Sequence, residues 1–268
     1  MSNPDLPAEL LDHTVDLLQD DTDALKSCCL VSASWVPRTR RHLFANVEFR
    51  FEKDLQTWKN TFPDPSASPA CYTDHLAITC LEEVTSADAE EHGWITAFSR
   101  LVQLHLEFKG LEISLLPFHG FSPALKALHV ECSHFPLSRI LNLVHSFPLI
   151  EDLSLIMADS SYPIEDIDGQ HAAAQPPLLR SLVVYARDGI GPIVSRIFPP
   201  QSGLHIRYLH LALTCEDDVF VLSALVERCR FTLESLKVHT GLYCTSAQDL
   251  CTHRWLTSIC RPTIVGPD

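Results

Sequence analysis

Two short His-x-Glu stretches carry the residues with the clearest capacity for chemistry. The first, HLE, contains His105 and Glu107, and the second, HVE, contains His129 and Glu131. Imidazole and carboxylate groups bind zinc, so the four side chains could form a metal site if they lie together. The histidines could instead be partly protonated beside the carboxylates, since the ordinary pKa of histidine is about 6.5. Protonation ranks higher, because a metal needs neutral imidazoles and a closed coordination shell.

The ten cysteines offer a second kind of chemistry. No two of them have the Cys-x-x-Cys spacing that is typical of zinc and redox sites. A group near the C-terminus has zinc-ligand residue types at a spacing that fits no common zinc motif: Cys244, Cys251, His253 and Cys260. Cys28 and Cys29 begin the stretch CCLVSASW, and no neighbour predicts a reactive thiolate. We therefore expect Cys28 to pack as a small apolar side chain.

Composition and motifs argue against several classes of function. The chain has 268 residues, 20 basic and 34 acidic, and its net charge of −14 disfavours binding to nucleic acid. It contains no apolar run of about 18 residues, and its acidic N-terminus does not resemble a signal peptide, so we expect a cytoplasmic or nuclear protein that binds no membrane. It lacks GxSxG, HExxH and glycine-rich phosphate motifs. We expect no enzymatic activity, no cofactor and no resident metal.

The first 45 residues have the pattern of three short helices. In LPAELLDHTVDLL the apolar residues recur at helical spacing, and Pro7 suits the first helical position. The acidic run that follows offers a cap for a second helix, from about Ala24. A domain of this size usually needs a metal, disulfides or a partner to be stable.

This segment resembles an F-box, in the form common in large fungal families. The matching residues are Leu-Pro-x-Glu-Leu, then Leu-x-x-Cys-x-Leu-Val-Ser-x-x-Trp, then Arg-x-x-Leu-Phe. F-box proteins dock this module onto the Skp-family adaptor of cullin–RING ubiquitin ligases. The resemblance implies that the docking surface, or the core beneath it, is formed by Leu6, Pro7, Leu10, Leu30, Val31 and Trp35. It also places Cys28 at the F-box cysteine position, in agreement with a packed side chain.

The pattern apolar-x-x-apolar-x-apolar recurs along the rest of the chain. Six clear copies are LVQLHL, LKALHV, IEDLSL, LRSLVV, IRYLHL and LESLKV, and FANVEF and TDHLAI are two weaker copies before them. A period of about 24–29 residues is typical of leucine-rich repeats, in which a short strand is followed by a helix or turn. The asparagine that often follows the strand is missing, so the sequence predicts a degenerate leucine-rich-repeat-like solenoid.

The predicted fold class is α/β, with three parts. An F-box-like helical module spans residues 1–45, a solenoid of parallel strands and returning helices or turns spans 46–240, and an irregular tail spans 241–268. Prolines indicate an irregular linker at about 53–72, and a polar, alanine-rich stretch indicates a mobile insertion at about 161–177. The tail offers no further copy of the strand pattern.

The residues that alternate with the inward apolar positions should line the concave face of the solenoid. That face is predicted to be rich in histidine in its N-terminal half, with Tyr185 and Tyr208 as a neighbouring apolar anchor. It could be a solvated sheet face, or it could recognise a protein target. The candidate residues for target binding are His105, Glu107, His129, Glu131, Tyr185, Tyr208 and His210.

Together these patterns favour a non-catalytic substrate-recognition subunit of a Skp–cullin–F-box type ubiquitin ligase. By resemblance, the module binds a Skp-family adaptor, and through it a cullin–RING ligase, while the solenoid presents an unknown protein target. The alternative is a protein-interaction scaffold in which the F-box-like helices only cap the solenoid.

Overall fold

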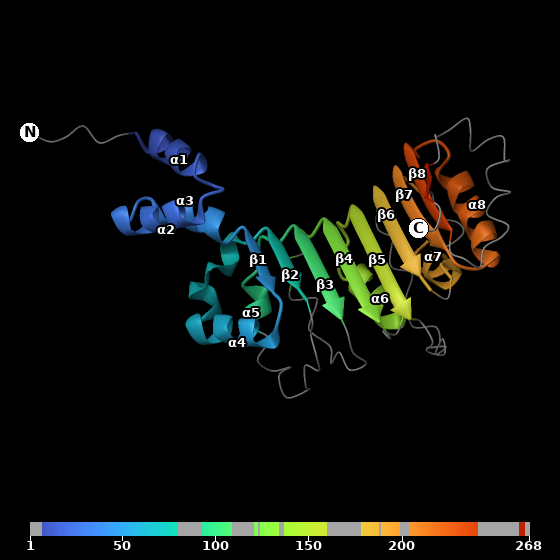
Figure 1. The fold of residues 1–268 in the computed structure, drawn as a ribbon, viewed down its shortest axis with the longest axis horizontal. Helices are drawn as coiled ribbons and strands as arrows, with labels where there is room; N and C mark the ends of the chain where they lie inside the picture. The colour runs from blue at the N-terminus through green and yellow to red at the C-terminus, as the bar shows by residue number, and fades with distance from the viewer. Residues whose placement is uncertain are drawn as a thin grey trace, which may run out of the picture.

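The structure is a computed structural model. It describes residues 7–79, 93–108, 121–122, 124–133, 137–159, 178–187, 189–198, 204–240 and 263–265. Three N-terminal helices are followed by one sheet of parallel strands with intervening helices, as Figure 1 shows. The predicted α/β solenoid is therefore confirmed. Among the described helices, none is both long and apolar enough to cross a membrane.

The N-terminal helices are α1 (Ala8–Asp16), α2 (Thr22–Val31) and α3 (Val36–Leu43). The acidic run caps α2 as predicted, because the Asp21 side chain accepts a hydrogen bond from the backbone N–H of Ala24 at 2.9 Å. Helix α3 contacts both α1 and α2. Val15 of α1 and Leu25 and Cys28 of α2 are buried.

Asp16, the last residue of α1, links this helix to α3 through polar contacts. Its carboxylate accepts a hydrogen bond from Arg38 Nε at 2.6 Å and lies 2.7 Å from His42 Nε2. The hydrogen bond from Arg38, together with the contact to His42, lowers the pKa of Asp16 well below its ordinary value. The carboxylate is therefore charged at neutral pH and holds the two helices together as an ion pair.

The eight copies of the repeat pattern form eight parallel strands in sequence order. They are β1 (Asn46–Phe49), β2 (His75–Ile78), β3 (Gln103–Phe108), β4 (Ala127–Ser133), β5 (Asp152–Asp159), β6 (Ser181–Ala186), β7 (Tyr208–Leu213) and β8 (Ser235–Thr240). Equivalent leucines are Cα partners across the sheet: Leu76, Leu104, Leu128, Leu153, Leu182, Leu209 and Leu236. None of these side chains is more than 3% exposed. The predicted strand positions and their inward register are confirmed.

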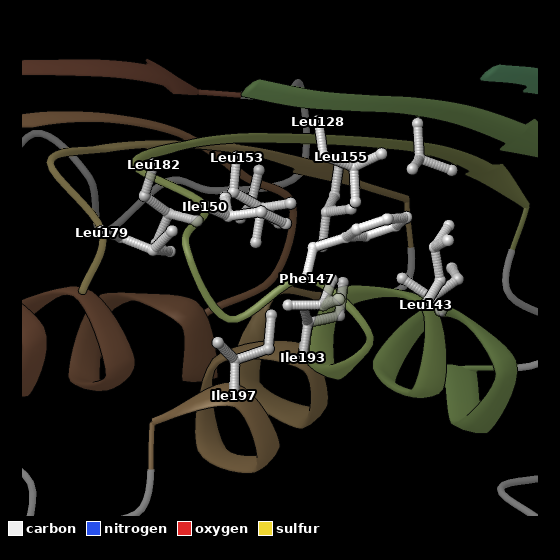
Figure 2. Close-up of a cluster of buried hydrophobic side chains, with 14 of the residues drawn as sticks. Leu128, Leu143, Phe147, Ile150, Leu153, Leu155, Leu179, Leu182, Ile193 and Ile197 are labelled. Atoms are coloured by element: carbon white, nitrogen blue, oxygen red, sulfur yellow. The ribbon is translucent and has the colours of Figure 1, made fainter. Parts of the chain in front are cut away.

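The buried face of the sheet packs against the helices between the strands. These are α4 (Glu52–Thr61), α5 (Gly93–Thr96), α6 (Leu137–His145), α7 (Gly191–Ile197) and α8 (Asp217–Cys229). Figure 2 shows Leu153 and Leu182 of the sheet above Phe147, which follows α6, and above Ile193 and Ile197 of α7. Because each repeat buries its apolar residues against its neighbours, the core is continuous along the sheet.

The region predicted as an irregular linker, at about 53–72, is more ordered than expected. It contains most of α4 and two 3-10 helices, η1 (Pro65–Ala67) and η2 (Pro69–Tyr72). Trp58 of α4 packs edge-on against Phe44 and Phe49, with ring centroids 6.0 Å and 5.6 Å apart. Pro65 and Pro69 open the two 3-10 helices, where a missing N–H costs nothing, and all three prolines of this region come after α4 ends at Thr61.

The C-terminal tail contributes a ninth strand that the repeat pattern does not predict. Strand β9 (Thr263–Val265) pairs in parallel with β8, and Val238 and Ile264 are Cα partners. It is only three residues long, too short to carry the six-residue repeat pattern. The predicted insertion at 161–177 and the rest of the tail lie outside the described residues.

A buried aspartate joins two successive repeats. Asp218, at the start of α8, is 1% exposed, and its Oδ1 accepts a hydrogen bond from the N–H of Ile190 at 2.8 Å. Its Oδ2 accepts hydrogen bonds from the N–H groups of Thr214 at 2.9 Å and Cys215 at 3.2 Å. Gly189 has a φ of +100°, and a Cβ there would lie 3.1 Å from Asp218 Oδ1. This contact explains why the chain has glycine at that turn.

Candidate functional site

The first candidate surface lies on the N-terminal helices. Leu10 on α1 is 52% exposed, and the adjacent Leu30 and Val31 at the end of α2 are 89% and 68% exposed. Pro7 is exposed and Trp35 is partly buried, whereas Leu6 lies outside the described residues. We call Leu10, Leu30 and Val31 the docking surface.

Within α2, the residues of the docking surface are exposed, whereas other apolar residues are buried. Cys28 is 7% exposed and packs inside the module, as expected, whereas Leu30 and Val31, two and three residues later, face solvent. Fully burying a leucine or valine side chain stabilises a protein by about 1.5–3 kcal/mol, so leaving two adjacent ones exposed is unfavourable. Large exposed apolar groups that lie together are typical of interaction sites.

The second candidate surface is the polar face of the sheet, opposite the helices. One row of Cα partners crosses it from β2 to β8: Ala77, His105, His129, Ser154, Val183, His210 and Lys237. The order and register of these residues are as predicted from the sequence. All but Lys237 are partly buried, so this face is a surface of side chains packed against each other across neighbouring strands.

Two neighbouring strands in the N-terminal half of the sheet, β3 and β4, carry a group of histidines and carboxylates. His105 pairs with His129, and Glu107 pairs with Glu131, as the sequence predicts. The two imidazole rings lie 4.3 Å apart between centroids, at an interplanar angle of 75°. Ligand atoms of His105, His129 and Glu131 all lie within 4.8 Å of one another. We call these three residues the β3–β4 cluster.

One histidine of this cluster is less readily protonated than the sequence predicts. Burial, and then the neighbouring His105, lower the pKa of His129 below its ordinary value. Water is the better solvent for the charged imidazolium, so a half-buried ring in this position is neutral at pH 7. In addition, Nε2 of His105 is buried and has no hydrogen-bond partner among the described residues. The cluster therefore combines a neutral His129 with a buried His105 Nε2 that has no hydrogen-bond partner among the described residues.

A second group lies towards the C-terminal end of the same face. The hydroxyl of Tyr185 is 2.6 Å from His210 Nε2, and the rings of His210 and His239 are 4.8 Å apart. Burial raises the pKa of Tyr185, and burial followed by His239 and Lys237 lowers the pKa of His210. The hydrogen bond therefore joins a neutral phenol and a neutral imidazole. His239 was not among the predicted site residues, although its position in the strand pattern of β8 indicated this face.

Tyr208 does not join Tyr185 in one apolar anchor, contrary to the prediction. Its Cα partner on β6 is Ser181, four residues before Tyr185, which corresponds to about 13 Å along the strand. Its hydroxyl donates to Glu234 Oε2 at 3.0 Å, and the Arg180 guanidinium lies 5.7 Å from its ring centroid. Tyr208 therefore belongs to an exposed ionic group at the other end of the strands.

Two further cysteines are placed where they cannot react readily. Cys132 on β4 is buried, which raises the pKa of its thiol to about 12, and burial raises that of Cys229 on α8 to about 11. The thiolate is the reactive form, so both side chains behave as apolar core residues. The predicted tail group of Cys244, Cys251, His253 and Cys260 lies outside the described residues.

Comparisons of the chain with models of known protein families, with curated proteins and with solved structures found no match. The two candidate surfaces of the chain are the docking surface on the N-terminal helices and the polar face of the solenoid.

Proposed function

We propose that the protein is a non-catalytic substrate-recognition subunit of a Skp–cullin–F-box type ubiquitin ligase. In this proposal the N-terminal helices dock on a Skp-family adaptor, and the solenoid binds a protein target. The observation that carries the proposal is the exposure of Leu30 and Val31, which are 89% and 68% exposed within the F-box-like stretch Leu-Val-Ser. The resemblance assigns these residues to the adaptor interface.

The position of the helices favours adaptor binding over the scaffold alternative. Helices α1 to α3 extend beyond the β1 end of the sheet (Figure 1). Helix α3 contacts η2, and Phe44, the residue after α3, packs against Trp58 of α4. A module that only capped the solenoid would bury its large apolar side chains against the sheet. Leu30 and Val31 instead remain open to a partner.

Such a subunit would act by proximity. Holding a target close to the ubiquitin carrier raises its effective concentration there and converts an encounter between separate molecules into an intramolecular step. The continuous core of the solenoid would hold the strands of the polar face in a fixed arrangement. No group of this chain would need to take part in the chemistry.

The proposal is tested by titrating a Skp-family adaptor into the full chain and its variants. Replacing Leu30 and Val31 together by serine should weaken binding at least tenfold, or by about 1.4 kcal/mol. The same loss is expected when Leu6 and Pro7 are replaced by alanine. Phe220→Ser is the matched control, because this side chain is also 75% exposed but lies on α8 at the opposite end of the sheet (Figure 1).

Phe220→Ser should leave the affinity for the adaptor unchanged. If the unmodified protein does not bind the adaptor at micromolar concentration, the ligase proposal is wrong and the scaffold becomes the better account. Equal losses in Phe220→Ser and the Leu30/Val31 variant would show that the docking surface is not specific.

A further inference from the structure

The geometry points to a binding site for a zinc ion on the polar face of the sheet, with His105, His129 and Glu131 as its protein ligands. This inference does not depend on the proposed ligase function. It concerns the middle of the solenoid, and its ligands are separate from the residues that would dock an adaptor.

The backbone of β3 and β4 places the three side chains together. His105 and His129 are Cα partners on adjacent parallel strands, and Glu131 lies two residues beyond His129 on the same face. Neighbouring strands are about 4.8 Å apart, so the two imidazoles are in contact without any rearrangement of the chain. The intervening residues Leu106 and Val130 point into the core and are fully buried, which fixes the strands beneath the site.

The donor atoms are close to the separation that zinc requires. They lie within 4.8 Å of one another, and zinc bonds of about 2.0–2.1 Å place the ligand atoms of a tetrahedral site about 3.3 Å apart. The site therefore closes when side-chain rotations shorten the distances between ligand atoms by at most about 1.5 Å. Glu131 is exposed and can make such a rotation freely.

The cluster also contains a buried donor atom that a metal would satisfy. A zinc ligand must be a neutral imidazole or a charged carboxylate, because the proton and the metal compete for the same lone pair. His105 Nε2 is a buried polar atom without a hydrogen-bond partner among the described residues, and coordination would satisfy it. Glu107, the Cα partner of Glu131, brings a second negative charge to the same place and favours a cation there.

The donor set selects the class of metal. Two imidazoles with one carboxylate suit zinc, whereas calcium and magnesium prefer sites made of oxygen ligands only. Three protein ligands leave a fourth tetrahedral position for water or for a donor atom of a bound partner. The group of Tyr185, His210 and His239 is less suited, because the Tyr185 hydroxyl already occupies His210 Nε2 and the cation of Lys237 is nearby.

The test is a calorimetric titration of Zn²⁺ into the metal-free full chain. We expect a site of one ion per chain, and we expect His129→Ala and Glu131→Gln each to weaken it at least tenfold. Glu131→Gln keeps the size of an exposed side chain, so its effect is not due to misfolding. His239→Ala is the matched control, since it removes a partly buried histidine from the same face and should leave Zn²⁺ binding unchanged.

A further variant distinguishes Zn²⁺ binding at this site from Zn²⁺ binding by the cysteines near the C-terminus. Replacing Cys251 and Cys260 together by serine should leave the site intact. The inference is overturned if the unmodified chain does not bind Zn²⁺ at micromolar concentration, or if Glu131→Gln and His129→Ala bind it as tightly as the unmodified chain. Loss of all binding in the cysteine variant would equally overturn it and assign the ion to the tail.

Discussion

Asp16 holds α1 in place through its hydrogen bonds to Arg38 and His42. We expect Asp16→Asn to weaken the attachment of α1 by about 1 kcal/mol, because charge-assisted hydrogen bonds are lost but the site is partly open to solvent. Hydrogen exchange of the α1 amides measures this local change. Asp12→Asn, which alters an exposed acidic residue of the same helix, should leave their exchange unchanged.

The same contact predicts a dependence on pH. The pKa of Asp16 in the folded protein lies below that of an unfolded aspartate, which is about 3.9. Its stabilisation is therefore fully present above about pH 4 and is lost as the pH falls further towards the folded pKa. The protection factors of the α1 amides, which correct for the pH dependence of intrinsic exchange, should fall on acidification in the unmodified chain and much less in Asp16→Asn. Equal acid sensitivity in both proteins would contradict this role of the residue.

Asp218 has a larger expected effect, because it is fully buried and accepts three backbone hydrogen bonds. Asp218→Ala leaves those N–H groups without their acceptor and should lower the free energy of unfolding by about 2–4 kcal/mol. The exposed neighbour Asp217→Ala should cost about 0.5 kcal/mol or less. Denaturant unfolding of the two variants compares them directly, and similar losses would show that the buried contact is unimportant.

The position of individual site residues was predictable from the sequence, but the pKa of their side chains was not. The strand period placed His105 next to His129 and Glu107 next to Glu131, because parallel strands in register repeat the same alternation. The lowered pKa of His129 was not predictable, since it follows from how closely the neighbouring strands bury the ring. Tyr208 was misplaced relative to Tyr185 because the pattern gives the face of a residue but not its distance along the strand.

The strands are stabilised mainly by the ladder of leucines that faces the helices. Leu153 of β5 is 1% exposed and lies between Leu128 and Leu182, so Leu153→Ala should lower the free energy of unfolding by about 2–5 kcal/mol. Ser154→Ala, one residue later on the polar face, should cost less than about 0.5 kcal/mol. Thermal or denaturant unfolding checks both, and equal losses would mean that the two faces are wrongly assigned.

Most elements of the solenoid were predictable because each strand repeats a six-residue pattern with inward leucine, isoleucine or valine. Helix α4 was missed because three prolines follow within its predicted linker, although they come after the helix ends at Thr61. Strand β9 was missed because its position depends on pairing with β8, which is a contact between residues far apart in the sequence. Three residues are also too few to show a strand pattern of their own.

The whole molecule has two ends with different surfaces. Helices α1 to α3 lie beyond β1 at one end, and α8 lies beside the last long strands at the other (Figure 1). Between them the polar face carries the β3–β4 cluster and the group around Tyr185. Strand β5 separates the two, with Ile156 between Glu131 and Tyr185 in the row of Cα partners. An adaptor and a target could thus bind at the same time without competing for residues.

The central claim, that the N-terminal helices are an adaptor-docking surface, is tested most directly by hydrogen–deuterium exchange of the full chain with and without a Skp-family adaptor. The account predicts slower exchange in α1 and α2 when the adaptor is saturating, with the amides of β3 to β8 unchanged. Unchanged exchange throughout α1 and α2, or protection confined to the sheet, would contradict it.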